Sequence, residues 1–166
     1  MTQLPNPILS GDFRIPFNRI RAEHVEPGII KALQEAQADI DQITSDTSEP
    51  TWDNTVGCLE LVGGLLSERI APPTHLVSVS ETPELREAYN AVLPEISAFW
   101  SSLPLNGPLW ARVKAYAESE EAAQLIGIKK RHLQKTVQDF IRAGADLEED
   151  EKKELMALKI ELAQLE

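Results

Sequence analysis

Apolar residues recur three and four positions apart along most of the chain, a spacing that gathers side chains on one face of an α-helix. The first such stripe follows Pro27, which suits the first turn of a helix, and ends in the polar run 44–50. A second stripe begins after Trp52 and is predicted to stop at the helix-breaking pair Pro72-Pro73. The two stripes are Ile29, Leu33, Ala36, Ile40 and Ile43, and then Val56, Leu59, Gly63, Leu66 and Ile70.

A third helix is predicted after residue 80. Thr82 can cap it, Pro83 suits its first turn, and Pro94 inside it should produce a kink. Its apolar stripe is Leu85, Tyr89, Val92, Ile96, Phe99 and Leu103. The turn Asn106-Gly107-Pro108 then restarts a short helix, whose apolar residues are Leu109, Val113 and Tyr116.

One further long helix is predicted from about Glu121 to Ala143. Gly144 follows it directly and supplies the residue type that a left-handed C-terminal cap favours. Its apolar positions are Leu125, Leu133, Val137, Phe140 and Ile141.

The last segment, residues 146–166, has the pattern of a helix that does not end. Asp146 can cap its start with Glu149 as the capping-box partner, and no Gly, Asn or Pro follows its leucine face. That face consists of Leu155, Leu158, Leu162 and Leu165. We therefore expect the chain to be a piece of a longer protein, truncated within this helix. Its 155–165 leucine face is expected to pack on absent sequence or to self-associate.

Residues 1–20 are predicted to form an extended lead-in, because prolines bias their neighbours away from helix. The lead-in carries Phe13, Ile15, Phe17 and Ile20, which are too apolar for a free tail, so we expect it to lie against the body of the domain. Residues 21–166 are predicted to form one helical domain. No segment alternates apolar and polar residues between turn signals, so the fold class is all-α with no sheet.

Charge and composition limit the classes of partner that the chain is expected to bind. The 166 residues are 42% hydrophobic with a net charge of −11, enough apolar content for an ordered core. An acidic surface repels phosphate backbones and anionic lipid, so we expect neither nucleic acid nor membrane as a partner. The single Cys58 cannot form an internal disulfide, and the N-terminus has no signal-peptide pattern. These features favour a cytoplasmic protein.

A search for catalytic chemistry assigns no residue. His24, His75 and His132 each lack a ligand-type neighbour three or four positions away on a helix, and the chain contains no His-Glu-x-x-His. Cys58 has an apolar helical setting, and the acids of 148–151 suit a helix first turn. The sequence therefore gives no catalytic, cofactor-binding or metal-binding residue, and no cofactor within this chain.

Two other groups of residues have ordinary structural interpretations. The cationic cluster 129–132 is expected to be a solvated helix face. Trp52, Trp100 and Trp110 are expected to anchor a core or an interface, with a binding groove as the alternative.

Four motifs nevertheless follow one another in a specific order. They are Ile15-Pro16-Phe17 with Ile20 and Glu23-His24-Val25-Glu26-Pro27, then Pro50-Thr51-Trp52-Asp53-Asn54-Thr55-Val56, then Pro83-Glu84-Leu85-Arg86-Glu87-Ala88-Tyr89, and finally Asp139-Phe140-Ile141-Arg142-Ala143-Gly144-Ala145-Asp146-Leu147. The series, which spans residues 13–166, resembles the N-terminal region of the thimet-oligopeptidase-like zinc metallopeptidases.

That resemblance implies a lobe of a helical, two-lobed peptidase whose channel admits short peptides. The family's zinc lies on a His-Glu-x-x-His helix with a further glutamate, and both would come after residue 166. We therefore expect a cytoplasmic oligopeptidase segment that is inactive alone and whose partners are short peptides and the missing C-terminal catalytic lobe. The alternative is a free-standing acidic helical module that binds a partner protein through the leucine face.

Overall fold

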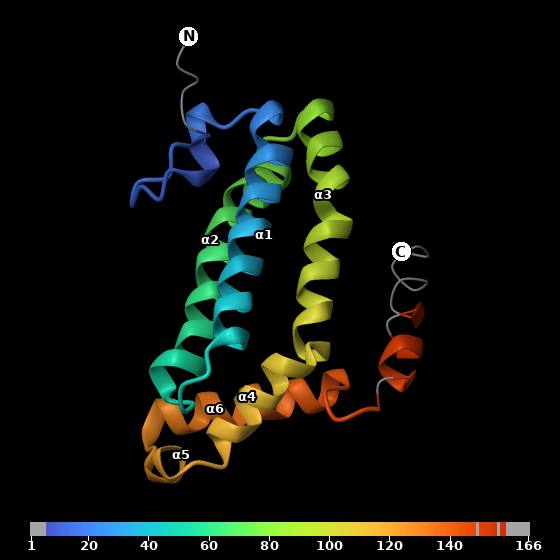
Figure 1. Ribbon diagram of the computed structural model, residues 1–166. Helices are drawn as coiled ribbons and strands as arrows, with labels where there is room; N and C mark the ends of the chain where they lie inside the picture. Colours follow the sequence, from blue (N-terminus) through green and yellow to red (C-terminus); the bar gives the residue numbers. More distant parts are fainter. Residues whose placement is uncertain (1–5, 149, 156, 159–166) are drawn as a thin grey trace. The chain divides into compact units, whose positions relative to one another are not determined.

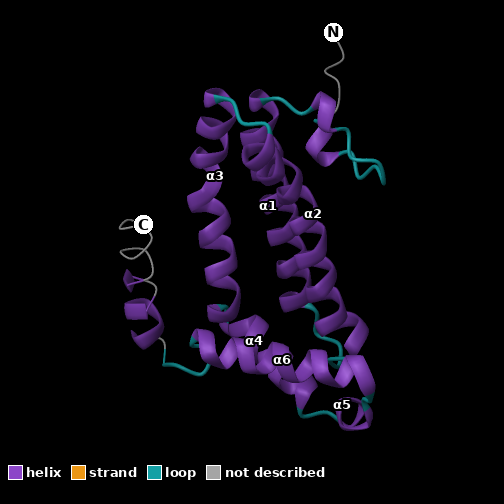
Figure 2. Cartoon of the chain, turned by 180° about the vertical axis from the view of Figure 1, so that it is seen from behind, coloured by secondary structure: helices purple, strands orange, loops and turns teal. Residues whose placement is uncertain are grey.

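The structure is a computed structural model that describes residues 6–148, 150–155 and 157–158. These residues form helices and loops, and none of them lies in a strand (Figure 2). The all-α prediction is confirmed. No helix within the described ranges is long and apolar enough to cross a membrane.

Up to residue 148, the structure defines six α-helices and four short 3₁₀ or π turns (Figure 1). Their bounds are α1 Ala22–Ser45, α2 Gly57–Val79, α3 Pro83–Ser102, α4 Gly107–Ala117, α5 Glu120–Gln124 and α6 Gly127–Ala143. The turns are η1 Pro7–Leu9, η2 Phe17–Arg19, η3 Trp52–Val56 and η4 Leu103–Leu105. The chain divides into two compact units, the first from residues up to 39 with 60–97, the second from 40–59 with the residues after 97.

Helix α1 begins earlier than the sequence predicts, and Pro27 lies inside it. The first turn is fixed from outside the helix: the Arg21 N–H donates to His24 Nδ1 at 3.0 Å, and Asn6 Nδ2 donates to the His24 carbonyl at 2.8 Å. The first bond satisfies a backbone N–H that a helix start leaves unpaired. The second joins the segment before α1 to its first turns.

The predicted break at Pro72-Pro73 is wrong, because α2 continues to Val79. A proline inside a helix costs about 3 kcal/mol relative to alanine, so something must compensate. Both rings are buried in unit 1, and burial of their apolar surface supplies a compensating term. The expected kink at Pro94 stays a prediction.

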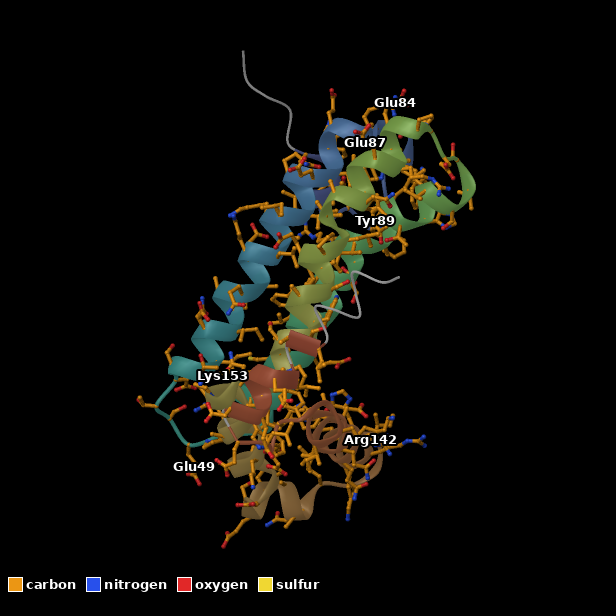
Figure 3. All side chains as sticks on the ribbon, turned by 90° about the vertical axis from the view of Figure 1, so that its right-hand side faces the viewer. Glu49, Glu84, Glu87, Tyr89, Arg142 and Lys153 are labelled. Atoms are coloured by element: carbon orange, nitrogen blue, oxygen red, sulfur yellow. The ribbon has the colours of Figure 1, made fainter. Side chains whose placement is uncertain are left out.

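Unit 1 is built on apolar helix faces. The parts of α1, α2 and α3 that belong to it lie side by side (Figures 1 and 2). The Thr82 hydroxyl accepts from the Leu85 N–H at 3.2 Å, which confirms Thr82 as the cap of α3. The buried residues of unit 1 that belong to the predicted stripes are Ile29, Leu33, Ala36, Leu66, Leu85, Val92 and Ile96. Val25 and Val62 are also buried, although no predicted stripe included them. Exposed acids such as Glu84 and Glu87 lie on the outer surface of α3 (Figure 3).

The described part of the lead-in, residues 6–20, contacts unit 1 only in part. Ile8 and Ile20 are buried, and the Phe17 ring lies 5.8 Å from the His75 ring. Phe13 is fully exposed, so the prediction that it packs against the body is wrong, and Ile15 is 41% exposed.

Unit 2 is centred on α4, which contacts η3, η4, α5 and α6. The helix restarts at Asn106-Gly107-Pro108 as predicted, and the Asn106 side chain caps α4 by accepting from the Leu109 N–H at 2.9 Å. The single helix predicted from Glu121 to Ala143 is instead two helices. Leu125 and Ile126 are extended, and Gly127 has a φ of +60°, which interrupts the helix between α5 and α6.

The end of α6 is capped as the sequence predicts. Gly144 has a φ of +105°, and the Ala145 N–H donates to the Phe140 carbonyl at 3.0 Å, the pattern of a Schellman cap. The next helical stretch does not start at Asp146. The Glu148 carbonyl accepts from the Lys152 N–H, and the Glu151 carboxylate accepts from the Glu148 N–H at 3.0 Å. Glu148 is therefore its cap, while Glu149, Leu162 and Leu165 lie outside the described residues.

Candidate functional site

The motif that begins at Pro50 forms the most densely hydrogen-bonded turn of unit 2. Thr51 and Asn54 form a reciprocal capping box: the Thr51 hydroxyl accepts from the Asn54 N–H at 3.3 Å, and Asn54 Oδ1 accepts from the Thr51 N–H at 2.8 Å. Asn54 Nδ2 also donates to Ser48 Oγ and to the Glu49 carbonyl, both at 3.0 Å. Asn54 therefore ties the loop after α1 to the π turn that opens α2.

Trp52 is the centre of the candidate site. Its backbone N–H donates to Glu121 Oε1 at 3.1 Å, the Lys129 ammonium lies 4.8 Å from its ring centroid, and the His132 ring meets it at 5.8 Å. Gly57 allows this packing, since a Cβ there would lie 2.9 Å from the Trp52 carbonyl oxygen. The indole thus joins η3 to α6 through a cation–π and an aromatic contact, and the Trp52 backbone N–H joins η3 to α5.

Tyr116 lies beneath this cluster and shares its carboxylate. Its hydroxyl donates to Glu121 Oε1 at 3.2 Å, and its ring is fully buried with Val56, Ala122 and Leu133. Burial, followed by the negative charge and hydrogen bond of Glu121, raises the pKa of Tyr116 to about 12. The phenol therefore stays neutral at physiological pH and acts here as a hydrogen-bond donor.

Arg112 forms the second polar link of unit 2. Its side chain is 8% exposed, donates to the Asp46 carbonyl at 2.6 Å and the Ser48 carbonyl at 3.1 Å, and pairs with Asp46 Oδ2 at 2.7 Å. Hydrogen bonds from the Ser48 backbone and hydroxyl, with the Arg112 charge, lower the pKa of Asp46. The guanidinium thereby closes the turn after α1 against α4.

Trp110 forms the third link. Its ring stacks on Phe140 at 5.7 Å, and its Nε1–H donates to Asp146 Oδ1 at 2.9 Å. The Lys114 ammonium lies 3.7 Å from the same carboxylate. Asp146, predicted as a helix cap, therefore joins α4 to the turn after α6 instead.

Trp52 and Trp110 are anchors of packing, as the sequence suggests, whereas Trp100 is partly exposed with its ring 5.6 Å from Phe99. The cationic cluster is only partly a solvated face, because Lys129 covers the Trp52 ring. Sequence reasoning missed Asp46, Arg112 and Glu121. No local pattern could have found them, since their partners lie more than sixty residues away.

The three histidines have separate local roles. His24 caps α1, His75 contacts Phe17, and His132 contacts Trp52. The Cys58 thiol lies 2.8 Å from the Asp53 carbonyl, to which it donates. Within the part of the chain that the structure describes, no three His, Cys, Asp or Glu side chains come together as a metal would require.

The clusters of unit 2 fix the ends of helices to one another through buried or half-buried polar contacts. Both units are helical throughout the residues that the structure describes, apart from their loops. Sequence comparison gives its family: the chain belongs to the neurolysin/thimet oligopeptidase N-terminal domain family, whose model matches residues 29–152.

Several curated relatives resemble nearly the whole chain. A probable cytosolic oligopeptidase A of Arabidopsis thaliana is 32% identical over 160 residues, covering 96% of this chain and 23% of the relative. Oligopeptidase A of Escherichia coli (strain K12) is 27% identical over 162 residues, covering 98% and 24%. An organellar oligopeptidase A of A. thaliana is 31% identical over 160 residues, covering 96% and 20%. The chain thus spans about a quarter of the length of these relatives or less.

Proposed function

We propose that this chain is the N-terminal helical portion of a zinc-dependent oligopeptidase that hydrolyses short peptides. In this proposal it forms part of the wall of the substrate channel, and the zinc ligands and general base lie outside these 166 residues. The observation that carries the proposal is the family match over residues 29–152, together with relatives named as oligopeptidases.

The structure supports a wall-forming role in physical terms. A wall that positions a peptide against a distant metal must hold its shape, since displacements of about 1 Å can cost about a hundredfold in rate. In unit 2, Arg112, Trp110 and Asn54 join segments far apart in sequence through hydrogen bonds, which restrains the loops as well as the helices. In this proposal the chain contributes shape and peptide contact, and the metal ligands come from other sequence.

The first test is the coding sequence beyond codon 166. We expect the reading frame to continue to a His-Glu-x-x-His helix, which would supply two zinc ligands and a general base. A stop codon at that point, with no peptidase lobe encoded downstream, would instead favour the free-standing interaction module.

The second test compares the 166-residue chain with the longest product of its gene. We expect the longer product to cleave an internally quenched short peptide and to leave intact a folded protein that contains a similar peptide sequence. Its activity should be lost on addition of a chelator and restored by zinc. The 166-residue chain should show no cleavage above buffer. Chelator-sensitive cleavage by the 166-residue chain itself would overturn the assignment of the zinc site to other sequence.

A cytoplasmic location is part of the proposal. One relative is named cytosolic and another organellar, so the names of relatives support either compartment. Fractionation of cells with an antibody against the chain tests this: recovery in an organelle pellet would refute it.

A further inference from the structure

The lead-in of unit 1 contains an exposed loop, residues 10–15, which we call the lead-in loop. It extends away from α1 and α2 (Figures 1 and 2). Phe13 in this loop is 106% exposed, more than any other large apolar residue that the structure describes, and Arg14 beside it is exposed as well. A phenylalanine held wholly in water is a local cost that a covering surface would remove.

The ends of the lead-in loop are fixed to unit 1. On its N-terminal side, Asn6 Nδ2 donates to a carbonyl of α1 at 2.8 Å, and Ile8 is buried. On its C-terminal side, the Phe17 ring contacts His75 of α2 at 5.8 Å, and Ile20 is buried. An anchored loop therefore presents the exposed phenylalanine, which reduces the conformational entropy that is lost when a partner orders it.

Arg69 of α2 lies next to the lead-in loop and has a buried donor without an acceptor. A Cβ added to Gly11 would lie 3.9 Å from Arg69 Nη2, which places the guanidinium beside the loop backbone. Arg69 Nη1 is buried and has no hydrogen-bond partner among the described residues. An unsatisfied N–H of a charged group is costly, and the strong partner of a guanidinium is a carboxylate, which accepts two N–H groups at once. The side chain as a whole is half-buried, so part of it is open to such a group.

The lead-in is cationic within an acidic chain. Residues 6–21 contain three arginines and one aspartate, a net charge of +2, whereas the whole chain has a net charge of −11. Aromatic residues and arginine are typical of the few side chains that dominate the binding energy of an interface. The surface that complements the lead-in loop is therefore an apolar pocket for Phe13 that is bordered by a carboxylate.

The size of the lead-in loop indicates where that surface comes from. A stable interface between separate proteins uses about 20–30 residues a side, far more than this loop offers. A small contact persists when both sides belong to one polypeptide, because the linkage raises their effective concentration. This chain covers 23% of one oligopeptidase A and 24% of another, so such relatives have ample further sequence to supply the surface.

We propose that the lead-in loop docks on a later part of the same polypeptide, beyond residue 166. Phe13 enters an apolar pocket there, and a carboxylate beside the pocket pairs with Arg69. The proposal rests on the proposed function only in that it needs the longer product of the gene. It makes no use of peptidase activity, so the two proposals can fail separately.

Limited proteolysis with trypsin tests the docking. Trypsin cleaves after arginine in exposed segments, so it should cut the bond between Arg14 and Ile15 rapidly in the 166-residue chain. In the longer product this cleavage should be at least about tenfold slower, because the protease must wait for the docked loop to open. Mass spectrometry of the released fragment, residues 1–14, measures the rate in both proteins.

Variants of the longer product identify the contacts that protect the loop. Phe13→Ser should raise the cleavage rate by about tenfold, and Arg69→Met should raise it by about threefold or more. Two controls in unit 1 should leave the rate unchanged: Leu61→Ser, at a residue of α2 that is 64% exposed, and Lys31→Met, at an exposed cation of α1. Each variant is also measured in the 166-residue chain. The ratio of the two rates then cancels any direct effect of the substitution on trypsin.

Each outcome decides the proposal. Protection of the loop in the longer product that is lost in both Phe13→Ser and Arg69→Met supports it. Equal cleavage rates in the two unaltered proteins overturn it, as does protection that either variant leaves intact. A reading frame that ends at codon 166 overturns this proposal and the peptidase proposal together. Protection of the loop in a longer product that has no peptidase activity supports the docking and overturns the peptidase proposal alone.

Discussion

Each of the two units is stabilised internally by a different kind of interaction. In unit 1, the helices bury continuous apolar stripes, and polar contacts between elements are few, such as those of Asn6 with His24 and of Thr74 with Tyr89. In unit 2, polar side chains join segments up to 69 residues apart, as Glu121 does with Trp52. The free energy gained from apolar burial scales with the buried area, so a small change of side chain costs little. A buried polar contact is lost whenever either partner is removed or displaced. Single substitutions should therefore be more disruptive in unit 2.

The largest expected effect is that of Arg112→Ala. It removes three hydrogen bonds and leaves the Asp46 and Ser48 carbonyls without their donor, so the free energy of unfolding should fall by about 3 kcal/mol. Chemical denaturation measures it, with Lys31→Ala as the control, since its exposed pair with Glu35 should be worth about 0.5 kcal/mol or less. Equal losses in both variants would remove the distinction between the units.

Alkaline pH should destabilise unit 2 through Tyr116. Its folded-state pKa is raised from 10.0 to about 12, so its contribution is complete below pH 10 and is lost as the pH rises toward 12. The loss should reach about 2 kcal/mol over that range. Unfolding curves measured across this range in the unaltered chain and in Tyr116→Phe check it. The free energy of unfolding should depend less steeply on pH in Tyr116→Phe. An identical pH dependence in both proteins would contradict the attribution of this effect to Tyr116.

Gly144→Ala should lower the free energy of unfolding by about 1.5 kcal/mol. The φ of +105° is strained for alanine, and the added Cβ would lie 2.7 Å from Leu155 Cδ2. Thermal unfolding measures the loss, and hydrogen exchange of residues 150–155 should report local loosening. Unchanged protection there would show that the cap does not hold this segment.

The smallest predicted effect has the opposite sign. Gly64→Ala, inside α2, should raise the free energy of unfolding by up to about 1 kcal/mol, because alanine favours helix and no atom lies within 4 Å of the added Cβ. It pairs with Gly144→Ala as the same substitution in the other unit. Destabilisation by Gly64→Ala would indicate a close contact that the structure does not show.

The sequence predicted the helices of unit 1 well where periodicity was the only signal. The buried residues of α3 follow its predicted stripe, and Thr82 caps it. Errors arose where a local rule was overridden. Pro27 lies inside α1, and Pro72-Pro73 is tolerated inside α2 because burial of both rings offsets the lost hydrogen bonds. The interruption at Gly127 was missed because the surrounding apolar spacing is helical on both sides.

The sequence by itself determined the all-helical class, most helix faces and the family, because these depend on local spacing and on motif order along the chain. Only the tertiary structure decided what the polar residues do. Asp146 bonds Trp110 rather than capping a helix, Glu121 serves both Trp52 and Tyr116, and Arg112 closes the turn at Asp46. A hydrogen bond is specified by the positions of two groups in space. Residues far apart in sequence acquire those positions only when the chain folds.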